Sequence, residues 1–135
     1  MILGMGSDIV DIRRIEQALQ RFGARFEERV FTPAEQAKAR SRKGGARNGM
    51  ASTYAKRFAA KEAFSKAVGT GFNFGVHMRD IEVVNLPTGQ PTLHLSHGAE
   101  QALQRLIPAG MHARIHLTLT DEYPMAQAHI VIEAH

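Results

Sequence analysis

The sequence lacks cysteine, and this absence excludes disulfide bonds and thiolate chemistry. It also lacks an apolar run long enough to span a membrane. The first residues, Met1 to Asp8, have neither the basic segment nor the long apolar core of a secretory signal peptide. We therefore expect a protein with no signal peptide and no membrane partner, located in the cytoplasm.

Acidic residues are fewer than basic ones, 13 against 17, which gives a net charge of +4 at pH 7. A basic balance favours anionic partners such as nucleotides, nucleic acid or an acidic protein. The basic residues are spread along the chain without a nucleic-acid-binding motif, although residues 41–47 form a short basic loop. A nucleic-acid-binding module without catalysis therefore stays as the alternative function. The length of 135 residues and 44% hydrophobic content indicate a single domain, residues 1–135.

The pattern over residues 49–68 predicts a long central helix. The segment has no proline, is rich in helix-forming residues, and is followed by Gly69, which is typical of a helix end. Its apolar residues cover nearly the whole circumference, so the helix should be buried in the domain or in an interface. Yet it also carries four cations and one carboxylate, whose burial is costly without a compensating anion: Lys56, Arg57, Lys61, Lys66 and Glu62.

Two interpretations of these charges stay open. The helix could be half exposed, with Glu62 and Lys66 forming an i,i+4 pair worth ~0.2–0.5 kcal/mol. Alternatively, the cations bind a polyphosphate, Glu62 binds a divalent metal, and the backbone of Gly69-Thr70-Gly71 approaches the ligand closely.

Residues 2–10 predict a nearly continuous apolar strand. Gly4 and Gly6 within it suggest a close backbone approach or a bulge. Asp8 is an acid within this strand and needs a partner, so it is either a turn or cap residue or a metal ligand.

A helix should follow from Asp11, a suitable N-cap, to Phe22, with Gly23 ending it. The helix and its exit carry arginines that form either a solvated face or a docking surface for an acidic protein: Arg13, Arg14, Arg21 and Arg25.

The remaining elements predict an α+β fold in which an antiparallel sheet is covered on one side. The segment Thr32-Pro33-Ala34-Glu35 has the pattern of a capping box and should open a helix to about Ala39. After the central helix we expect a hairpin of strands 80–85 and 92–96, a helix over 98–106, and a second hairpin of strands 113–120 and 126–132.

Histidine and threonine pairs give weaker signals. His112 and His116 are four residues apart on a predicted strand, where that spacing is not a zinc signature. Thr118 and Thr120 lie on a polar strand face, which is usually plain exposed β surface, although the hydroxyls could also contact a ligand.

Three segments together resemble the holo-acyl-carrier-protein synthase family, the small phosphopantetheinyl transferases: GMGSDIVDI at 4–12, KRFAAKEAFSKA at 56–67 and GTG at 69–71. The segments DIEV at 80–83, GQP at 89–91 and YPMA at 123–126 follow in the family's order, so the resemblance covers nearly the whole chain. It implies an α+β fold of the phosphopantetheinyl-transferase type, with an antiparallel sheet packed against a long central helix.

The resemblance also implies an activity. The family transfers the 4′-phosphopantetheine group of coenzyme A to a serine of apo-acyl carrier protein, releasing adenosine 3′,5′-bisphosphate, in fatty acid biosynthesis. By resemblance, Asp8 and Glu62 hold Mg²⁺ on the pyrophosphate. Glu62, directly or through a water on the metal, is the base for the serine hydroxyl. Lys66 contacts the pyrophosphate and either protonates or neutralises the leaving group.

Further roles follow from the same resemblance. Coenzyme A would be bound by phosphate contacts, by the glycine loop and, more weakly, by two hydroxyls: Arg57, Lys61, Lys66, Gly69, Thr70, Gly71, Thr118 and Thr120. Arg14, with Arg13, Arg21 and Arg25, would meet the acidic carrier protein. The sequence departs at Asp121, where many members carry histidine, so no histidine role is carried over.

The family is typically a homotrimer with sites between subunits, which would explain a central helix that is apolar nearly all round. A purely structural trimer, in which this helix only packs subunits, is a third interpretation.

Overall fold

A computed structural model of the chain describes residues 1–43 and 48–135. The predicted basic loop 41–47 therefore lies partly outside the described residues. In chain order the helices and strands are β1 (Ile2–Asp11), α1 (Ile12–Phe22), α2 (Ala24–Val30), α3 (Pro33–Arg40), α4 (Gly49–Ala67), a 3₁₀ turn η1 (Met78–Asp80), β2 (Ile81–Asn85), β3 (Pro91–Leu95), α5 (His97–Gln104), β4 (Ala113–Glu122) and β5 (Met125–Ala134).

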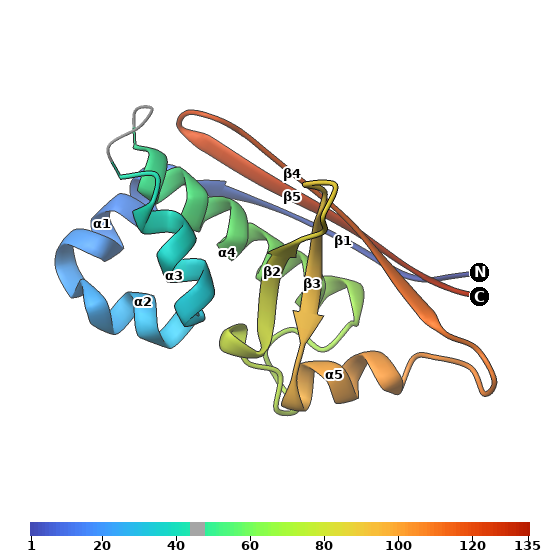
Figure 1. Cartoon of the computed structure of the whole chain (residues 1–135). Coiled ribbons are helices and arrows are strands. Elements are labelled where there is room, and N and C mark those ends of the chain that lie inside the picture. The colour runs from blue at the N-terminus through green and yellow to red at the C-terminus, as the bar shows by residue number, and fades with distance from the viewer. Residues whose placement is uncertain (44–47) are drawn as a thin grey trace.

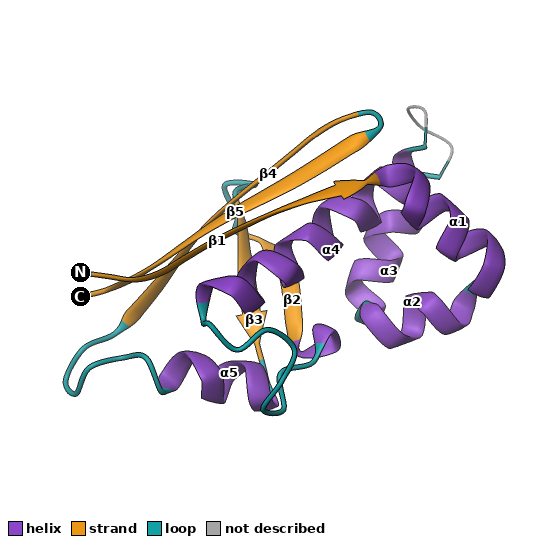
Figure 2. Cartoon of the chain, turned by 180° about the vertical axis from the view of Figure 1, so that it is seen from behind, coloured by secondary structure: helices purple, strands orange, loops and turns teal. Residues whose placement is uncertain are grey.

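Helix α4 runs along one face of an antiparallel sheet with the strand order β1-β5-β4 (Figures 1 and 2). The two-stranded sheet β2-β3 packs nearby, helices α1 and α3 pack against α4, and α2 packs against α1. This arrangement confirms the predicted α+β fold with an antiparallel sheet against a long central helix. No helix in the described part of the chain is long and apolar enough to cross a membrane.

The first and last strands of the chain lie side by side. In the β1–β5 pairing, Asp8 faces Ala128 and Met5 faces Val131. The sequence predicted only local hairpins, because this pairing joins opposite ends of the chain. The alternation in β5 is confirmed, since its inward residues are buried against α4: Ala126, Ala128, Ile130 and Ile132.

Strand β1 approaches the α4 backbone at two glycines. A Cβ atom on Gly4 would lie 2.1 Å from the carbonyl oxygen of Ala67, and one on Gly6 would lie 2.0 Å from that of Ala63. Both distances are far inside van der Waals contact, so only glycine fits at these positions. Of the two predicted alternatives, the close approach is therefore confirmed. The strand also has a shift in register between Ile2 and Gly4.

Local signals set most helix ends as predicted. Asp11 caps α1 by accepting a hydrogen bond from the Arg13 N–H at 3.0 Å, and Thr32 and Glu35 form the capping box of α3. Helix α2 was not predicted. Gly23, with φ of 54°, ends α1 and at once begins α2, so the expected helix stop is a kink between two helices.

The burial of α4 takes place within its own chain. Strands β1 and β5 pack on one side of the helix, and α1, α3 and β2 pack on others. The apolar circumference therefore needs no second subunit, which corrects the reason given from the sequence for a trimer. The outer face of β1 is instead exposed and apolar, because Ile2, Met5 and Ile9 are 62%, 67% and 57% exposed.

The glycine contact yields the first prediction. Gly6→Ala should lower the free energy of unfolding by roughly 1–3 kcal/mol, because the added methyl forces β1 away from α4. Urea unfolding followed by circular dichroism measures the change. Ser7→Ala, at the exposed neighbouring position, is the control and should stay within about 0.5 kcal/mol of the starting chain. Equal stability of the two variants would contradict the close approach.

Candidate active site

Two acidic side chains from distant parts of the sequence converge on one cavity. Asp8 extends from β1 and Glu62 from the second half of α4, and both line a cavity of about 400 Å³. The rest of the lining is mainly apolar and comes from β1, α1, α2 and α4: Ile9, Val10, Arg14, Ile15, Ala18, Phe26 and Phe58. The glycine contact holds β1 against α4 and so sets the spacing of the two carboxylates.

The Glu62 carboxyl lies in an environment that disfavours its ionisation. Burial raises the pKa of Glu62 above its usual range, the negative charge of Asp8 raises it further, and Lys66 partly lowers it. Such a pair is stabilised by a cation placed between or beside the carboxylates.

Lys66 supplies one cation at the edge of this site. Its Nζ lies 3.0 Å from Asp8 Oδ1 and donates a hydrogen bond to the carbonyl of Ser7, also at 3.0 Å. The described ion pair of Lys66 is therefore with Asp8 on β1, and not the i,i+4 pair with Glu62 that a half-exposed helix would have.

The glycine loop follows directly after this turn of the helix. Gly69 and Gly71 have φ of 81° and 58°, a backbone conformation that favours glycine. The Gly71 N–H donates to the carbonyl of Ser65 at 3.1 Å, which folds the loop back onto the end of α4. The loop thus lies one turn beyond Lys66.

The pair Asp8 and Glu62 suits a magnesium ion that a phosphate ligand completes. Within residues 1–43 and 48–135, no group of three or more His, Asp or Glu side chains is placed to hold a metal. Mg²⁺ is commonly held by only one or two carboxylates together with phosphate oxygens and waters. The two acids, one of them partly desolvated, match that donor set.

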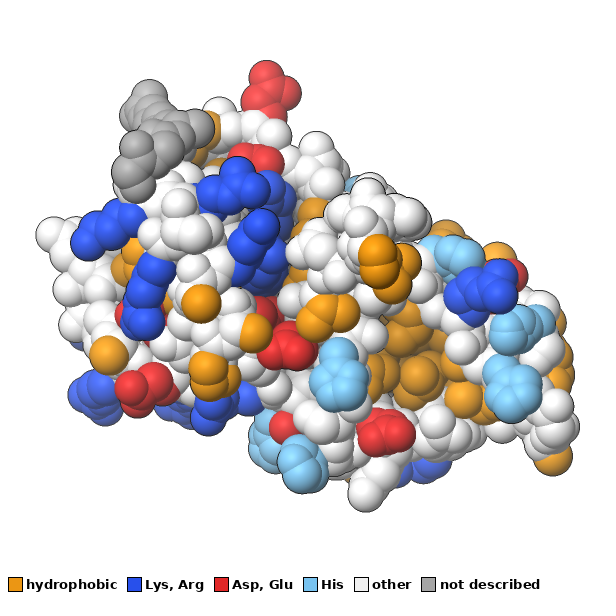
Figure 3. Space-filling model, viewed as in Figure 1, with side chains coloured by type: hydrophobic (Ala, Val, Ile, Leu, Met, Phe, Trp, Pro, Cys, Tyr) orange, Lys and Arg blue, Asp and Glu red, His pale blue; other side chains and the backbone are white. Residues whose placement is uncertain are grey.

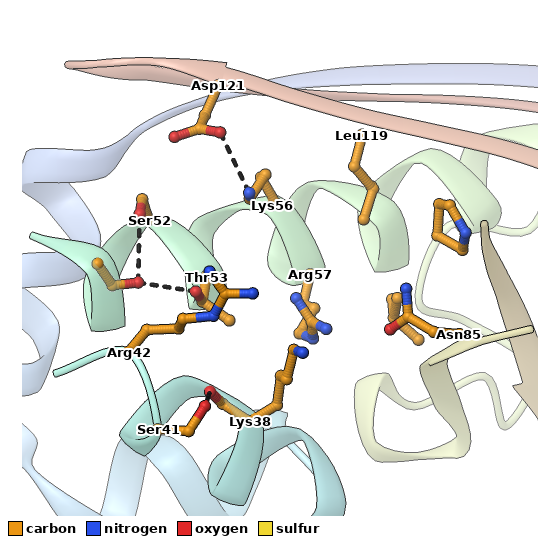
Figure 4. A pocket seen from close by; sticks show the side chains of 13 residues that line it. Lys38, Ser41, Arg42, Ser52, Thr53, Lys56, Arg57, Asn85, Leu119 and Asp121 are labelled. Atoms are coloured by element: carbon orange, nitrogen blue, oxygen red, sulfur yellow. Dashed lines mark hydrogen bonds and ion pairs between the residues drawn. The ribbon is translucent and has the colours of Figure 1, made fainter. Parts of the chain in front are cut away.

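A second pocket, of about 460 Å³, lies on another side of α4 (Figure 4). Figure 3 shows that Lys and Arg side chains gather over the helical half of this face. Four basic residues line the pocket, together with Ser41, Ser52, Thr53 and Asn85 among others: Lys38, Arg42, Lys56 and Arg57. One acidic residue lines it, Asp121, which pairs with Lys56 at 3.1 Å.

Arg57 is the most unusual of these residues. Its side chain is buried, with 6% of the residue exposed, and its Nε has no hydrogen-bond partner among the described residues. Burial lowers the pKa of Arg57, while the charge of Glu35 raises it. A buried guanidinium with an unpaired N–H is suited to an anion entering the pocket.

The structure places Lys61, a predicted phosphate ligand, in the core and at neither pocket. Lys61 is fully buried, and its Nζ lies 2.8 Å from Glu35 Oε1 and donates to the carbonyls of Met78 and Ile81. All of its donors therefore serve the core, where it joins α4 to α3, η1 and β2. Periodicity cannot reveal this role, because the partner carboxylate lies on another helix.

The two threonines are not brought to either pocket that carries the predicted site residues. Thr118 and Thr120 are exposed on β4, and their neighbours Leu117 and Leu119 face inward. Thr120 lines a separate cavity with Gln127 at the edge of the sheet. Within one chain, the predicted coenzyme A contacts of Thr118 and Thr120 are thus not supported.

The predicted docking arginines lie on α1 and α2 beside the Asp8–Glu62 cavity. Arg14 lines the cavity itself. Arg13 is paired with Asp11 at 2.6 Å, and Arg21 stacks over the ring of Phe22 at 5.1 Å. Arg25 is exposed on α2. Arg14 is therefore the member of this group closest to the acidic pair.

Sequence reasoning missed several residues of the second pocket. Lys38 and Arg42 stand at the end of α3 and just after it, and Asn85 ends β2. The signal that could have found them is the concentration of basic residues around 38–43, of which the predicted basic loop at 41–47 included only Arg42 and Lys43.

The fold and the acidic pair define a class of protein. Residues 4–128 match the model of the 4′-phosphopantetheinyl transferase superfamily. The chain belongs to this superfamily, as the motifs of the sequence implied. Membership favours the transferase interpretation over the nucleic-acid-binding alternative.

The comparisons narrow the class further. The chain is 57% identical to the holo-[acyl-carrier-protein] synthase of Brucella ovis over 134 residues, which cover 99% of this chain and 96% of the relative. Among solved structures, it superposes on the holo-[acyl-carrier-protein] synthase of Neisseria meningitidis with a TM-score of 0.81 at 34% identity, covering 98% and 99% of the two chains. A holo-(acyl-carrier-protein) synthase of Bacillus anthracis in complex with CoA (3′,5′-ADP) gives a TM-score of 0.77 at 37% identity, covering 98% and 97%.

The buried ion pair yields the second prediction. Lys61→Met should destabilise the fold by roughly 3–5 kcal/mol, because it leaves the Glu35 carboxylate buried without its cation. The double variant Lys61→Met/Glu35→Gln should regain part of this loss, as measured by thermal and urea unfolding. A Lys61→Met chain of unchanged stability that no longer binds coenzyme A would restore the phosphate role instead.

Proposed function

We propose that this chain is a holo-acyl-carrier-protein synthase that transfers 4′-phosphopantetheine from coenzyme A to a serine of apo-acyl carrier protein. The serine oxygen attacks the phosphorus next to the pantetheine arm, and the bond from that phosphorus to the bridging oxygen of the pyrophosphate breaks. Adenosine 3′,5′-bisphosphate leaves. The observation that carries the proposal is the convergence of Asp8 and Glu62 on one cavity, with Lys66 paired to Asp8, in a member of this superfamily.

Glu62 is the proposed base that takes the proton of the serine hydroxyl. Its pKa is raised by burial and by Asp8, so it accepts a proton more readily than an ordinary carboxylate. The base form exists only above this raised pKa.

Asp8 and Glu62 are the proposed ligands of Mg²⁺, which when bound would neutralise charge on the pyrophosphate and polarise the phosphoryl oxygens. Lys66 lies beside Asp8 and contributes a second positive charge for the leaving phosphate. The backbone of Gly69-Thr70-Gly71 continues from this end of α4 and shapes the approach of the ligand.

The basic pocket around Arg57 is the proposed site for a further phosphate group of coenzyme A. Arg57 and Glu62 are five residues apart, so they point about 140° apart around α4. The two pockets of one chain therefore face different directions. A coenzyme A molecule that uses both kinds of site would lie between subunits, which supports a homotrimer in which neighbouring chains each supply one pocket.

Two further surfaces agree with this proposal. The exposed apolar residues Met5 and Ile9 on β1 offer a surface for subunit contact. Arg14 with Arg21 and Arg25 offers positive charge beside the acidic pair, where an acidic carrier protein would present its serine. Such an enzyme would act in fatty acid biosynthesis in the cytoplasm.

The proposed base gives the third prediction. Glu62→Gln should reduce the transfer rate by roughly 10²–10⁴-fold, because the amide cannot take the serine proton. The thermal midpoint at neutral pH should not fall, since a desolvated charge is removed next to Asp8. Rates come from the appearance of holo-carrier protein with time. Glu100→Gln, at an exposed position on α5, is the matched control and should keep the full rate. Normal turnover of Glu62→Gln would exclude Glu62 as the base.

The basic pocket gives the fourth prediction. Arg57→Met should weaken coenzyme A binding by roughly 1.5–3 kcal/mol, because a charge-assisted hydrogen bond is lost. The stability of the ligand-free chain should not fall, since the guanidinium is buried with an unpaired Nε. Calorimetric titration and thermal unfolding measure the two effects. Arg79→Met on η1 removes a charge from an exposed residue and should change neither. Unchanged coenzyme A affinity in Arg57→Met would place the phosphate elsewhere.

A further inference from the structure

The ammonium of Lys66 rests on two oxygen atoms of β1. Its Nζ lies 3.0 Å from the carboxylate oxygen Oδ1 of Asp8 and 3.0 Å from the carbonyl oxygen of Ser7. Carboxylate and carbonyl oxygens are the hard ligands that Mg²⁺ and similar cations take in proteins. The ammonium of Lys66 therefore already occupies Asp8, the residue that is proposed to bind Mg²⁺.

A metal ion and the ammonium cannot share Asp8 without cost. Two positive charges a few ångströms apart repel each other strongly where solvent screening is incomplete, and the Asp8 side chain is only 17% exposed. The Lys66 side chain is 53% exposed at the end of a flexible stem, so it can swing away without disturbing the core. The arrangement favours exchange of one cation for the other.

We propose that Lys66 is a displaceable counter-ion: its ammonium neutralises Asp8 in the metal-free chain, and the divalent metal displaces it toward the phosphates of coenzyme A. The inference rests on the proposed function and deepens it. By displacing Lys66, the metal frees a donor for the phosphate ligand. By attracting Lys66, the phosphate ligand clears Asp8 for the metal. Binding of the two is therefore mutually reinforcing, because such coupling is reciprocal.

The inference predicts an unusual direction of change. Lys66→Met should bind Mn²⁺, used as the probe metal, about five- to tenfold more tightly than the unaltered chain when coenzyme A is absent. Calorimetry and the paramagnetic resonance signal of free Mn²⁺, with titrations extended to millimolar metal, measure the affinity. Arg105→Gln loses one positive charge beyond α5 and should change the affinity by less than about twofold. Asp8→Asn should lose the site.

A second titration tests the coupling. Coenzyme A should raise the Mn²⁺ affinity of the unaltered chain by a larger factor than that of Lys66→Met, since the variant has no ammonium to release. Lys66→Arg keeps the charge and should behave more like the unaltered chain. Should Lys66→Met fail to fold, Lys66→Gln replaces it, because the removed ammonium is exposed in either case.

The results that would overturn the inference are distinct from those that would overturn the transferase. Three results would each refute the exchange of cations. Lys66→Met could bind Mn²⁺ no more tightly than the unaltered chain, or neither of these two chains could bind Mn²⁺ measurably. Alternatively, Asp8→Asn could bind Mn²⁺ as tightly as the unaltered chain. A chain that shows the exchange and yet transfers no phosphopantetheine would refute the proposed function and leave the exchange standing.

Discussion

The close contact between β1 and α4 is the constraint on which the rest of the structure depends. Gly4 and Gly6 let the strand lie directly on the helix carbonyls of Ala67 and Ala63, where any side chain would collide. The same contact places Asp8, two residues further along β1, beside Glu62 and Lys66. A strand held further out by one methyl group would separate the acids, so the site and the core share one packing requirement.

Two neighbouring residues of α4 have different roles: Lys61 stabilises the fold, and Glu62 lies in the proposed active site. Lys61 points into the core and binds Glu35, whose carboxylate also closes the α3 capping box and accepts the Val83 N–H at 3.0 Å. Glu62 points instead into the cavity with Asp8. The buried pair fixes the rotation of the helix about its axis, and this rotation decides which charges reach the ligand.

The sequence allowed prediction of the features that depend on neighbouring residues. The capping box at Thr32, the helix ends near Asp11 and Gly69, the alternation in β5 and the glycine approach in β1 all follow from local patterns. The resemblance to a known family supplied the pairing of Asp8 with Glu62, which no local pattern joins.

The features that sequence reasoning missed depend on partners distant in the chain. The β1–β5 pairing joins the two ends, and Lys61 is buried only because Glu35 on α3 meets it. The basic pocket around Arg57 is assembled from α3, α4, β2 and β4. Helix α2 was missed for another reason, because Gly23 can end a helix and begin the next one with equal ease.

The most direct test of the account is intact-mass spectrometry of an apo-acyl carrier protein incubated with this chain, coenzyme A and Mg²⁺. We predict a mass increase of one phosphopantetheine group, which disappears when a chelator is added and when the chain carries Asp8→Asn. A folded chain that binds coenzyme A and Mg²⁺ but leaves the mass of the carrier protein unchanged would contradict the account. So would transfer at the full rate by Asp8→Asn.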